Sequence, residues 1–292
     1  MTPHDRCDFK AMTRSNHLNM QACMRTVLMI LFFVSLLLPT ANSQHRPEIH
    51  CKHFLHGYPY GTPPTNDLII RSIYALSSND STKLADWVAY RLDRDIISGP
   101  QRTRNWAPAP WLDESETLEP SPRHGDYKDA YGIISTDRGH QAPLGSFDGS
   151  EDWYQTNYLS NITPQKSPLN RGPWSLLEAK VRDMVEIYGV IYVMTGPLYE
   201  REMPSLPNAD EVHLVPSGYW KIVLYSDESD YIQSSAFILD QESPSSFPIL
   251  DALVTIDEVE RRSGLDFLWE LPDAVEDAIE SNLNMEWAEA HF

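Results

Sequence analysis

Residues 173–199 limit the possible folds more than any other segment, because a helical pattern is followed there directly by the pattern of a buried strand. Apolar residues recur at intervals of three and four after Pro173, and Gly189 follows them where a helix would end. These apolar positions are Leu176, Leu177, Val181, Met184, Val185 and Tyr188. The next segment, VIYVMTGPLY at residues 190–199, predicts a buried strand.

Further strand patterns lie on both sides of this helix. Residues 67–76 and 84–92 are β-branched and aromatic, and the turn-rich residues 77–82 separate them, which predicts a strand pair. Residues 218–226 and 236–241 predict two more strands. Strands before and after a central helix indicate an α+β domain with a mainly antiparallel sheet.

The C-terminal part predicts two helices. Residues 255–264 form the first, in which Thr255 and Glu258 make a capping box and Gly264 ends the helix. An acidic amphipathic helix is expected from residue 272 onward. Its apolar positions lie four apart, at Val275, Ile279 and Leu283.

The N-terminal 43 residues are predicted to be a targeting segment. Arg25 precedes an apolar run at residues 27–38, and the small residues before Ser43 suit signal-peptide cleavage close to that residue. An uncleaved membrane anchor is the alternative, but twelve residues span only about 18 Å of a bilayer core of roughly 30 Å. We therefore expect export, extracellular or periplasmic, without stable membrane association. Translation starting at Met1 and at Met24 both remain open.

Three regions are expected: a leader at 1–43, a catalytic domain at 44–272 and an acidic C-terminal helix or tail at 273–292. Removing the leader leaves Cys51 as the only cysteine, so the exported chain cannot form an internal disulfide. Cys51 either stays free or links two chains. The Pro-rich residues 101–127 predict a long loop, and loops of that length are often functional.

Charge is distributed unevenly along the chain. The formal net charge of −19 would repel a polyanion at long range. Residues 251–292 hold twelve acidic residues against Arg261 and Arg262, a net charge of −10. We expect this acidic face to lie away from any phosphate-binding cleft, and a local positive groove elsewhere. The basic residues expected in that groove are Arg102, Arg104, Arg138, Lys166, Arg171 and Arg182.

Candidate catalytic residues occur in DRGHQAPLGSF, residues 137–147, and in the segment before the central helix. His140 can accept a proton from water near neutral pH, although a lone loop histidine is more often a surface or packing residue. Asn170 and Glu178 offer the oxygen ligands that hydrated Mg²⁺ prefers. In the alternative interpretation, Glu178 and Arg182 form only an exposed ion pair.

Several segments together resemble the DNA/RNA non-specific endonuclease family, whose members are ββα-metal nucleases of the Serratia nuclease and endonuclease G type. DRGHQAPLGSF resembles the family signature, and YLSNITPQKSPLNRGPWSLLE at residues 158–178 resembles its metal-binding segment. The similarity covers roughly residues 50–272. Further similar segments follow in the family's order: ADWVAYRL, TRNW, YVMTGPLY, YWKIVLY, AFILDQ and GLDFLWELPD.

The resemblance implies a role for each candidate residue. His140 matches the general base, Asn170 the sole protein ligand of Mg²⁺, and Glu178 the acid that orients water at the metal and helps protonate the leaving group. Arg104 matches the arginine that stabilises the transition state. Arg138, Arg182 and Asn161 match accessory residues that hold phosphate or lie near the catalytic centre.

The resemblance also implies a fold and an activity. The fold is an antiparallel sheet flanked by helices, with a β-hairpin and a helix forming the metal finger. The activity is Mg²⁺-dependent hydrolysis of DNA and RNA through backbone contacts, with Mn²⁺ as an alternative ion and 5′-phosphate and 3′-hydroxyl ends. The resemblance is also compatible with a homodimer, because members of the family include dimers. The rival functions are a specialised nuclease, such as a toxin, and a catalytically silent nucleic-acid-binding module.

Overall fold

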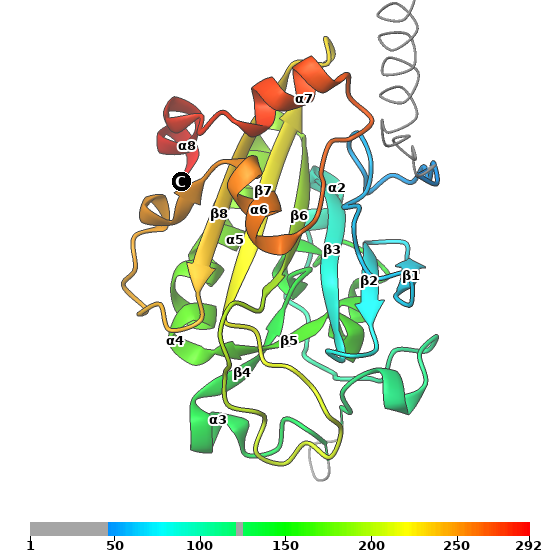
Figure 1. Ribbon diagram of the computed structural model, residues 1–292. Helices are drawn as coiled ribbons and strands as arrows, with labels where there is room; N and C mark the ends of the chain where they lie inside the picture. The colour runs from blue at the N-terminus through cyan, green and yellow to red at the C-terminus, as the bar shows by residue number, and fades with distance from the viewer. Residues whose placement is uncertain (1–45, 121–124) are drawn as a thin grey trace, which may run out of the picture. The chain divides into compact units, whose positions relative to one another are not determined.

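Seven strands form one antiparallel sheet, in the order β1-β2-β3-β6-β7-β8-β9, within the described residues (Figure 1). The computed structural model describes residues 46–120 and 125–292, so the predicted leader at 1–43 lies outside them. The strands are β1 (Asp67–Ile70), β2 (Ala75–Asn79), β3 (Leu84–Asp93), β6 (Val190–Leu198), β7 (Gly218–Ser226), β8 (Ile232–Asp240) and β9 (Leu253–Val254). The mainly antiparallel sheet and the α+β class are thereby confirmed.

Alternating side chains of the central strands pack on opposite faces of this sheet. On β7, Trp220 and Ile222 join a core on one face with Val259 of helix α6 (Ile256–Ser263). Tyr219 and Val223 belong to cores on the other face, which is covered by helix α5 (Ser175–Tyr188). Burying a large apolar side chain stabilises the fold by roughly 1.5–3 kcal/mol. The sheet therefore lies between two helical layers, which is why its central strands are apolar on both faces.

A second, two-stranded sheet lies beside the main one. Strand β4 (Thr136–His140) pairs antiparallel with β5 (Ile162–Lys166), and His140 lies opposite Ile162. Gln241 attaches this pair to the main sheet, because it accepts a hydrogen bond from the Lys166 backbone at 2.8 Å and donates one to Pro164 O at 2.8 Å. The pair continues into α4 (Ser167–Leu169), a wide turn η5 (Asn170–Trp174) and α5. This is the strand–strand–helix finger that the resemblance implied.

The remaining helices are short. They are α2 (Arg94–Ile97), α3 (Ala130–Ile134), α7 (Asp273–Glu280) and α8 (Met285–His291), with single turns η1 (Glu114–Glu116), η2 (Leu144–Ser146), η3 (Trp153–Asn157), η4 (Leu159–Asn161) and η6 (Ile249–Ala252). Figure 1 shows α7 and α8 at the end of the sheet opposite to β4, β5 and α3. Residues 101–120 form the expected loop, interrupted only by η1. No helix among the described residues is long and apolar enough to cross a bilayer.

Three local expectations differ from the structure. Residues 67–76 contain two strands, because the chain reverses between β1 and β2, where the Arg71 backbone N–H donates to Tyr74 O at 2.8 Å. The helix expected from residue 272 is split into α7 and α8 at Asn284, whose φ is +48°. In the predicted capping box, Thr255 does cap α6, but the Glu258 carboxylate instead receives two hydrogen bonds from Arg261.

The C-terminal residues pack onto the rest of the domain. Residues 48–292 form one unit, so 273–292 are part of it. The hydroxyl of Tyr188, at the end of α5, lies 2.7 Å from His291 Nε2, and Trp287 and Phe292 pack on the apolar cores of that face. Cys51 is free and half-buried against the core on the α6 face.

Candidate active site

A cavity of about 890 Å³ opens where the β4–β5 pair meets the start of α5. Its walls come from the long loop (Gln101, Arg104 and Trp106), from β4, from the turn after it, and from η5 and α5. Of the seven site residues predicted from sequence, six line this cavity: Arg104, Arg138, His140, Asn170, Glu178 and Arg182. Segments more than 70 residues apart in the chain thus meet at one site.

His140 ends strand β4 and is held in place by two neighbours. Its Nε2 lies 3.2 Å from the Asn157 side-chain oxygen, and its ring lies 5.3 Å from the ring of Trp106 at an angle of 35°. Asn157 in turn donates a hydrogen bond to Thr103 O, which fixes its amide. Burial lowers the pKa of His140 to about 4, partly opposed by the contact with Asn157, while the charge of Arg104 lowers it further. The imidazole is therefore neutral near pH 7 and can accept a proton.

The glycine beside His140 is required by the close packing of two strands. Gly139 lies inside β4 opposite Thr163. A Cβ at this position would lie 2.5 Å from the Gln165 side-chain oxygen and 2.8 Å from its Cβ. Only a residue without a side chain lets the two strands approach at this point.

Asp137 holds Asn170 through a network of charged hydrogen bonds. Arg171 donates two bonds to the Asp137 carboxylate, at 2.8 and 2.7 Å, and the Asn170 amide nitrogen donates a third at 3.0 Å. Although burial opposes ionisation of Asp137, hydrogen bonds from Arg171, Asn170 and Ser167 lower its pKa. Because the amide nitrogen of Asn170 faces this carboxylate, its carbonyl oxygen is the atom left to act as a metal ligand. Asp137 thus holds Asn170 and Arg171 in position at the cavity.

The backbone between Asn170 and Glu178 is not one continuous helix. Gly172 has φ −103° and ψ −111°, which interrupts the helical path before Pro173. A Cβ on Gly172 would lie 2.6 Å from the Cα of Ser245, so the close approach of another segment requires glycine. Asn170 and Glu178 therefore do not lie on one regular helix, although both residues line the same cavity.

Glu178 has a buried cationic neighbour that the sequence analysis did not identify. Lys221 of β7 is fully buried, and its Nζ lies 4.4 Å from the centre of the Trp174 ring and 3.5 Å from the Tyr90 hydroxyl. Burial raises the pKa of Glu178, and the charges of Lys221 and Arg182 oppose that rise. Burial likewise lowers the pKa of Lys221, opposed by Glu178. Each group supplies the opposite charge that makes burial of the other tolerable.

Four arginines make the cavity wall cationic. Arg104 is exposed, Arg138 lies 5.1 Å over the Tyr127 ring, Arg171 pairs with Asp137, and Arg182 contacts the Ser146 hydroxyl. The acidic lining residues are only Asp137 and Glu178. Burial lowers the pKa of Arg138, but its guanidinium stays charged at neutral pH. A local positive groove therefore exists on a chain whose formal charge is −19.

Two residues expected in the positive groove do not line this cavity. Arg102 donates to Asp148 O at 2.9 Å, and Lys166 donates to Ile134 O at 2.7 Å. Both cations thus satisfy backbone carbonyls elsewhere. A sequence cannot distinguish a basic residue that faces a cleft from one that fastens a loop.

Asn161 also lies outside the cavity wall. Its side chain is fully buried, accepts a hydrogen bond from Ala142 N, and donates to Ala142 O and Thr156 O at 2.8–2.9 Å. Its contacts fix the loop that follows His140, so it differs from the substrate-binding role that the resemblance implied. The neighbouring Asn157 is the asparagine that contacts His140. Asn157 and Lys221 are two residues near the site that were not predicted from sequence. Of these two, Lys221 had a usable signal in the sequence, because it is a lysine within an otherwise apolar strand pattern.

Comparison with known proteins identifies the family. Residues 55–274 match the family of DNA/RNA non-specific endonucleases. The chain is 42% identical over 219 residues to a nuclease of Serratia marcescens, an alignment that covers 74% of this chain and 80% of that one. The chain belongs to this family. It is an endonuclease, and the family is one of metal-dependent nucleases.

Two further relatives are named as mitochondrial proteins. The chain is 28% identical over 246 residues to a mitochondrial nuclease of Saccharomyces cerevisiae, covering 78% of this chain and 73% of that one. It is 27% identical over 221 residues to mitochondrial endonuclease G of Bos taurus, an alignment that covers 72% of this chain and 71% of that one. A chain from the crystal structure of the EndoG/EndoGI complex superposes with a TM-score of 0.63 at 23% identity, covering 75% of this chain and 90% of that one. That likeness concerns the fold alone.

Proposed function

We propose that this protein is an exported, Mg²⁺-dependent endonuclease that hydrolyses phosphodiester bonds in both DNA and RNA. One observation carries the proposal: a neutral imidazole, an oriented amide oxygen and a partly buried carboxyl line the same arginine-rich cavity. The residues are His140, Asn170 and Glu178. A module that only binds nucleic acid would need the arginines but not this acid–base set.

The donor set suits a hard divalent cation. The Asp137 carboxylate turns the carbonyl oxygen of Asn170 away from itself, and Glu178 adds a carboxylate to the same cavity. Mg²⁺ prefers oxygen ligands and keeps several waters, so one protein ligand suffices, with Mn²⁺ as an alternative. When bound there, the ion would supply charge neutralisation at a phosphate oxygen and at the leaving oxygen.

The protein residues perform the proton transfers. His140 removes a proton from the water that attacks phosphorus, which its neutral state at pH 7 permits. The bond from phosphorus to the 3′ oxygen breaks, which gives 5′-phosphate and 3′-hydroxyl ends. Glu178, whose pKa is raised by burial, helps return a proton to the leaving 3′ oxygen.

The arginines bind the phosphate and not the bases. Arg104 stabilises the additional negative charge of the transition state, and Arg138 and Arg182 hold the phosphate backbone. Contacts of this kind carry no sequence information and need no 2′-hydroxyl, so both DNA and RNA are substrates.

Export and assembly are further parts of the proposal. The apolar run at residues 27–38 is the basis for a cleaved leader near Ser43. A homodimer is proposed only from the resemblance to the family.

A toxin, or a nuclease selective for one nucleic acid, would use the same catalytic groups, so only substrate assays separate it from a general nuclease.

Nicking of supercoiled plasmid tests the proposed function. The His140→Ala variant should lose about 10²–10⁴-fold in kcat, because the general base is removed, while binding of nucleic acid is retained. His50→Ala is the matched control, since His50 lies on the exposed surface paired with Glu48. EDTA should abolish nicking by the wild type and Mg²⁺ should restore it. Full activity of His140→Ala would show that His140 is not the base.

A further inference from the structure

Three carboxylates converge between α6 and α7, outside the active-site cavity. Asp257 and Glu260 belong to α6, and Glu280 ends α7. One oxygen atom from each of the three lies within 4.8 Å of the other two. Like charges at this spacing repel each other unless a proton or a cation lies between them.

Glu280 is the unusual member of this cluster. Its side chain is only 4% exposed, and its Oε1 atom has no hydrogen-bond partner in the described part of the chain. The preceding residue, Ile279, packs against the apolar core, and this contact holds the end of α7 against the domain. An unpartnered carboxylate oxygen buried in this way costs free energy until something pairs with it.

The surrounding charges increase this cost. Burial raises the pKa of Glu280 to about 9, and the carboxylates of Glu260, Glu276, Asp257 and Asp266 add to the effect. Burial also raises the pKa of Glu260 to about 7. Glu260 is already fixed in place, because its Oε1 accepts a hydrogen bond from the Phe267 backbone at 2.9 Å.

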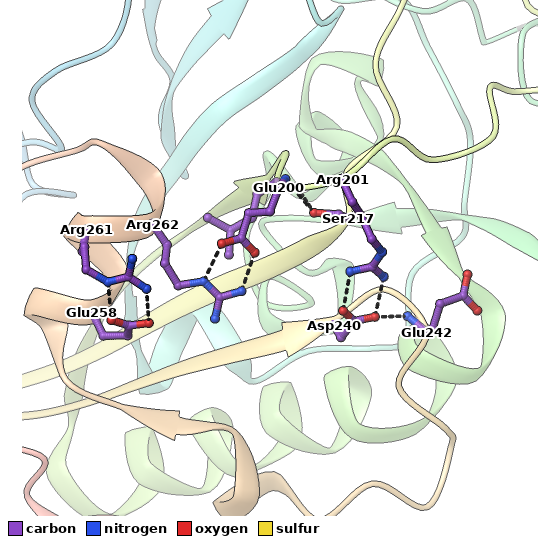
Figure 2. A network of polar contacts seen from close by, with 9 residues as sticks. Glu200, Arg201, Ser217, Asp240, Glu242, Glu258, Arg261 and Arg262 are labelled. Carbon is purple, nitrogen blue, oxygen red and sulfur yellow. Dashed lines mark hydrogen bonds and ion pairs between the residues drawn. The ribbon is translucent and has the colours of Figure 1, made fainter.

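The basic residues of α6 are paired with other acids. Arg261 donates two hydrogen bonds of 2.7 Å to Glu258, and Arg262 pairs with Glu200 of the segment after β6 (Figure 2). Arg201, the next basic residue of that network, pairs with Asp240. Residues 251–292 contain no other lysine or arginine, so this part of the chain offers the cluster no cationic side chain of its own.

We propose that Asp257, Glu260 and Glu280 form a Ca²⁺ site that fastens α7 to α6. Ca²⁺ binds carboxylate oxygens at about 2.3–2.6 Å, so three oxygens within 4.8 Å of one another can all reach one ion. Asp257 is exposed, which leaves the site open to the waters that complete the coordination. Mg²⁺ requires shorter, near-octahedral contacts and loses its waters reluctantly. The site is independent of the catalytic cavity and of the proposed nuclease mechanism.

Thermal unfolding of the full-length protein tests this site. After removal of metals with a chelator, CaCl₂ is added at constant ionic strength and the Tm is measured. A cation that binds only the folded state should raise the Tm by on the order of 5 °C at one hundred times its dissociation constant. The rise should persist in Asn170→Ala, which lacks the proposed catalytic metal ligand, and in that variant Mg²⁺ at the same concentration should produce a smaller rise than Ca²⁺.

The variants Glu280→Gln and Asp277→Asn form a matched pair on α7. Each replaces one carboxyl group by an amide, but Asp277 is exposed and does not belong to the cluster. Calorimetric titration should show Ca²⁺ binding at least about tenfold weaker in Glu280→Gln and unchanged in Asp277→Asn. Equal affinity in Glu280→Gln, no response of the wild-type Tm to Ca²⁺, or an equal response of Asn170→Ala to Mg²⁺ and Ca²⁺ would each overturn the assignment. Nicking activity should be unchanged in Glu280→Gln.

Discussion

The catalytic cavity and the α6–α7 cluster both contain buried ionisable groups, but among the residues that the structure describes only those of the cavity are paired with an opposite charge or an amide. In the cavity, Asp137 has Arg171, Glu178 has Lys221, and His140 contacts a neutral amide. In the α6–α7 cluster, the partly buried carboxylate of Glu260 and the buried carboxylate of Glu280 lie close to each other. The comparison shows that local pairing, and not net charge, decides which ionisation states a folded chain can hold. A site lacking such pairing must take up protons or an external cation.

The comparison is tested most severely by removing the buried cation of the cavity. Lys221→Met leaves Glu178 without its largest opposing charge, and breaking one partner of a buried pair typically costs about 3–5 kcal/mol of unfolding free energy. Urea unfolding at pH 7.5 would measure the loss. The double variant Lys221→Met/Glu178→Gln should recover part of it, because the unpaired charge is then absent. Additive effects of the two substitutions would show that the groups are not coupled.

A second test concerns the carboxylate that orients Asn170. Asp137→Asn removes the charged acceptor of both Asn170 and Arg171, and such outer contacts are worth about 10–100-fold in metal affinity. The Mg²⁺ concentration that gives half-maximal nicking should rise accordingly, and saturating Mg²⁺ should restore much of the rate. Asp183→Asn, an exposed change on α5, is the control. An unchanged Mg²⁺ requirement would contradict the proposed role of Asp137.

The pH dependence of kcat/KM should report on His140. Because burial lowers its pKa to about 4, the imidazole stays neutral down to about pH 5, whereas an ordinary histidine with a pKa of 6.5 would be mostly protonated at pH 5.5. At pH 5.5 the enzyme should therefore keep about tenfold more activity than an unshifted histidine allows. An NMR titration of the His140 ring would assign the effect, and a midpoint near 6.5 would refute it. The stability associated with this neutral histidine is present above pH 6.5 and is lost as the pH falls through 4.

The last test concerns the α6–α7 cluster when no cation is present. The pKa of Glu280 is raised by burial to about 9, so the folded state holds a proton that the unfolded chain releases above about pH 4.5. In EDTA, stability should therefore decline as the pH rises from 4.5 to 9. Glu280→Gln should flatten this decline, as followed by urea unfolding at several pH values. A decline of equal slope in the variant would place its origin elsewhere.

The sequence predicted the regular parts of the fold well. The strand 218–226 and the helix ending at Gly189 occur as expected, because continuous apolar runs and helical spacing are local properties of the chain. The reversal inside residues 67–76 was missed, since Ile69, Ile73 and Tyr74 keep the segment apolar across a turn that has no glycine or proline. The break at Asn284 was missed for a similar reason, because a non-glycine residue adopts positive φ there.

The site was predictable where the residue types themselves carry the chemistry. His140, Asn170, Glu178 and three arginines were expected from motif resemblance, and all line one cavity. Asn157 and Asn161 could not be told apart, because each is an asparagine in the same short stretch. Their different roles depend on which backbone groups and which imidazole the fold places beside them.

By itself, the sequence determined the α+β class, the family and the identity of most residues in the cavity, because periodicity and side-chain chemistry are properties of the chain. The tertiary structure decided which charges meet. It buried Lys221 within reach of the charge of Glu178, turned Arg102 and Lys166 toward backbone carbonyls, and brought Glu280 close to Asp257 and Glu260. The physical reason is that electrostatic interactions depend on distance and burial, and neither can be read from positions along the chain.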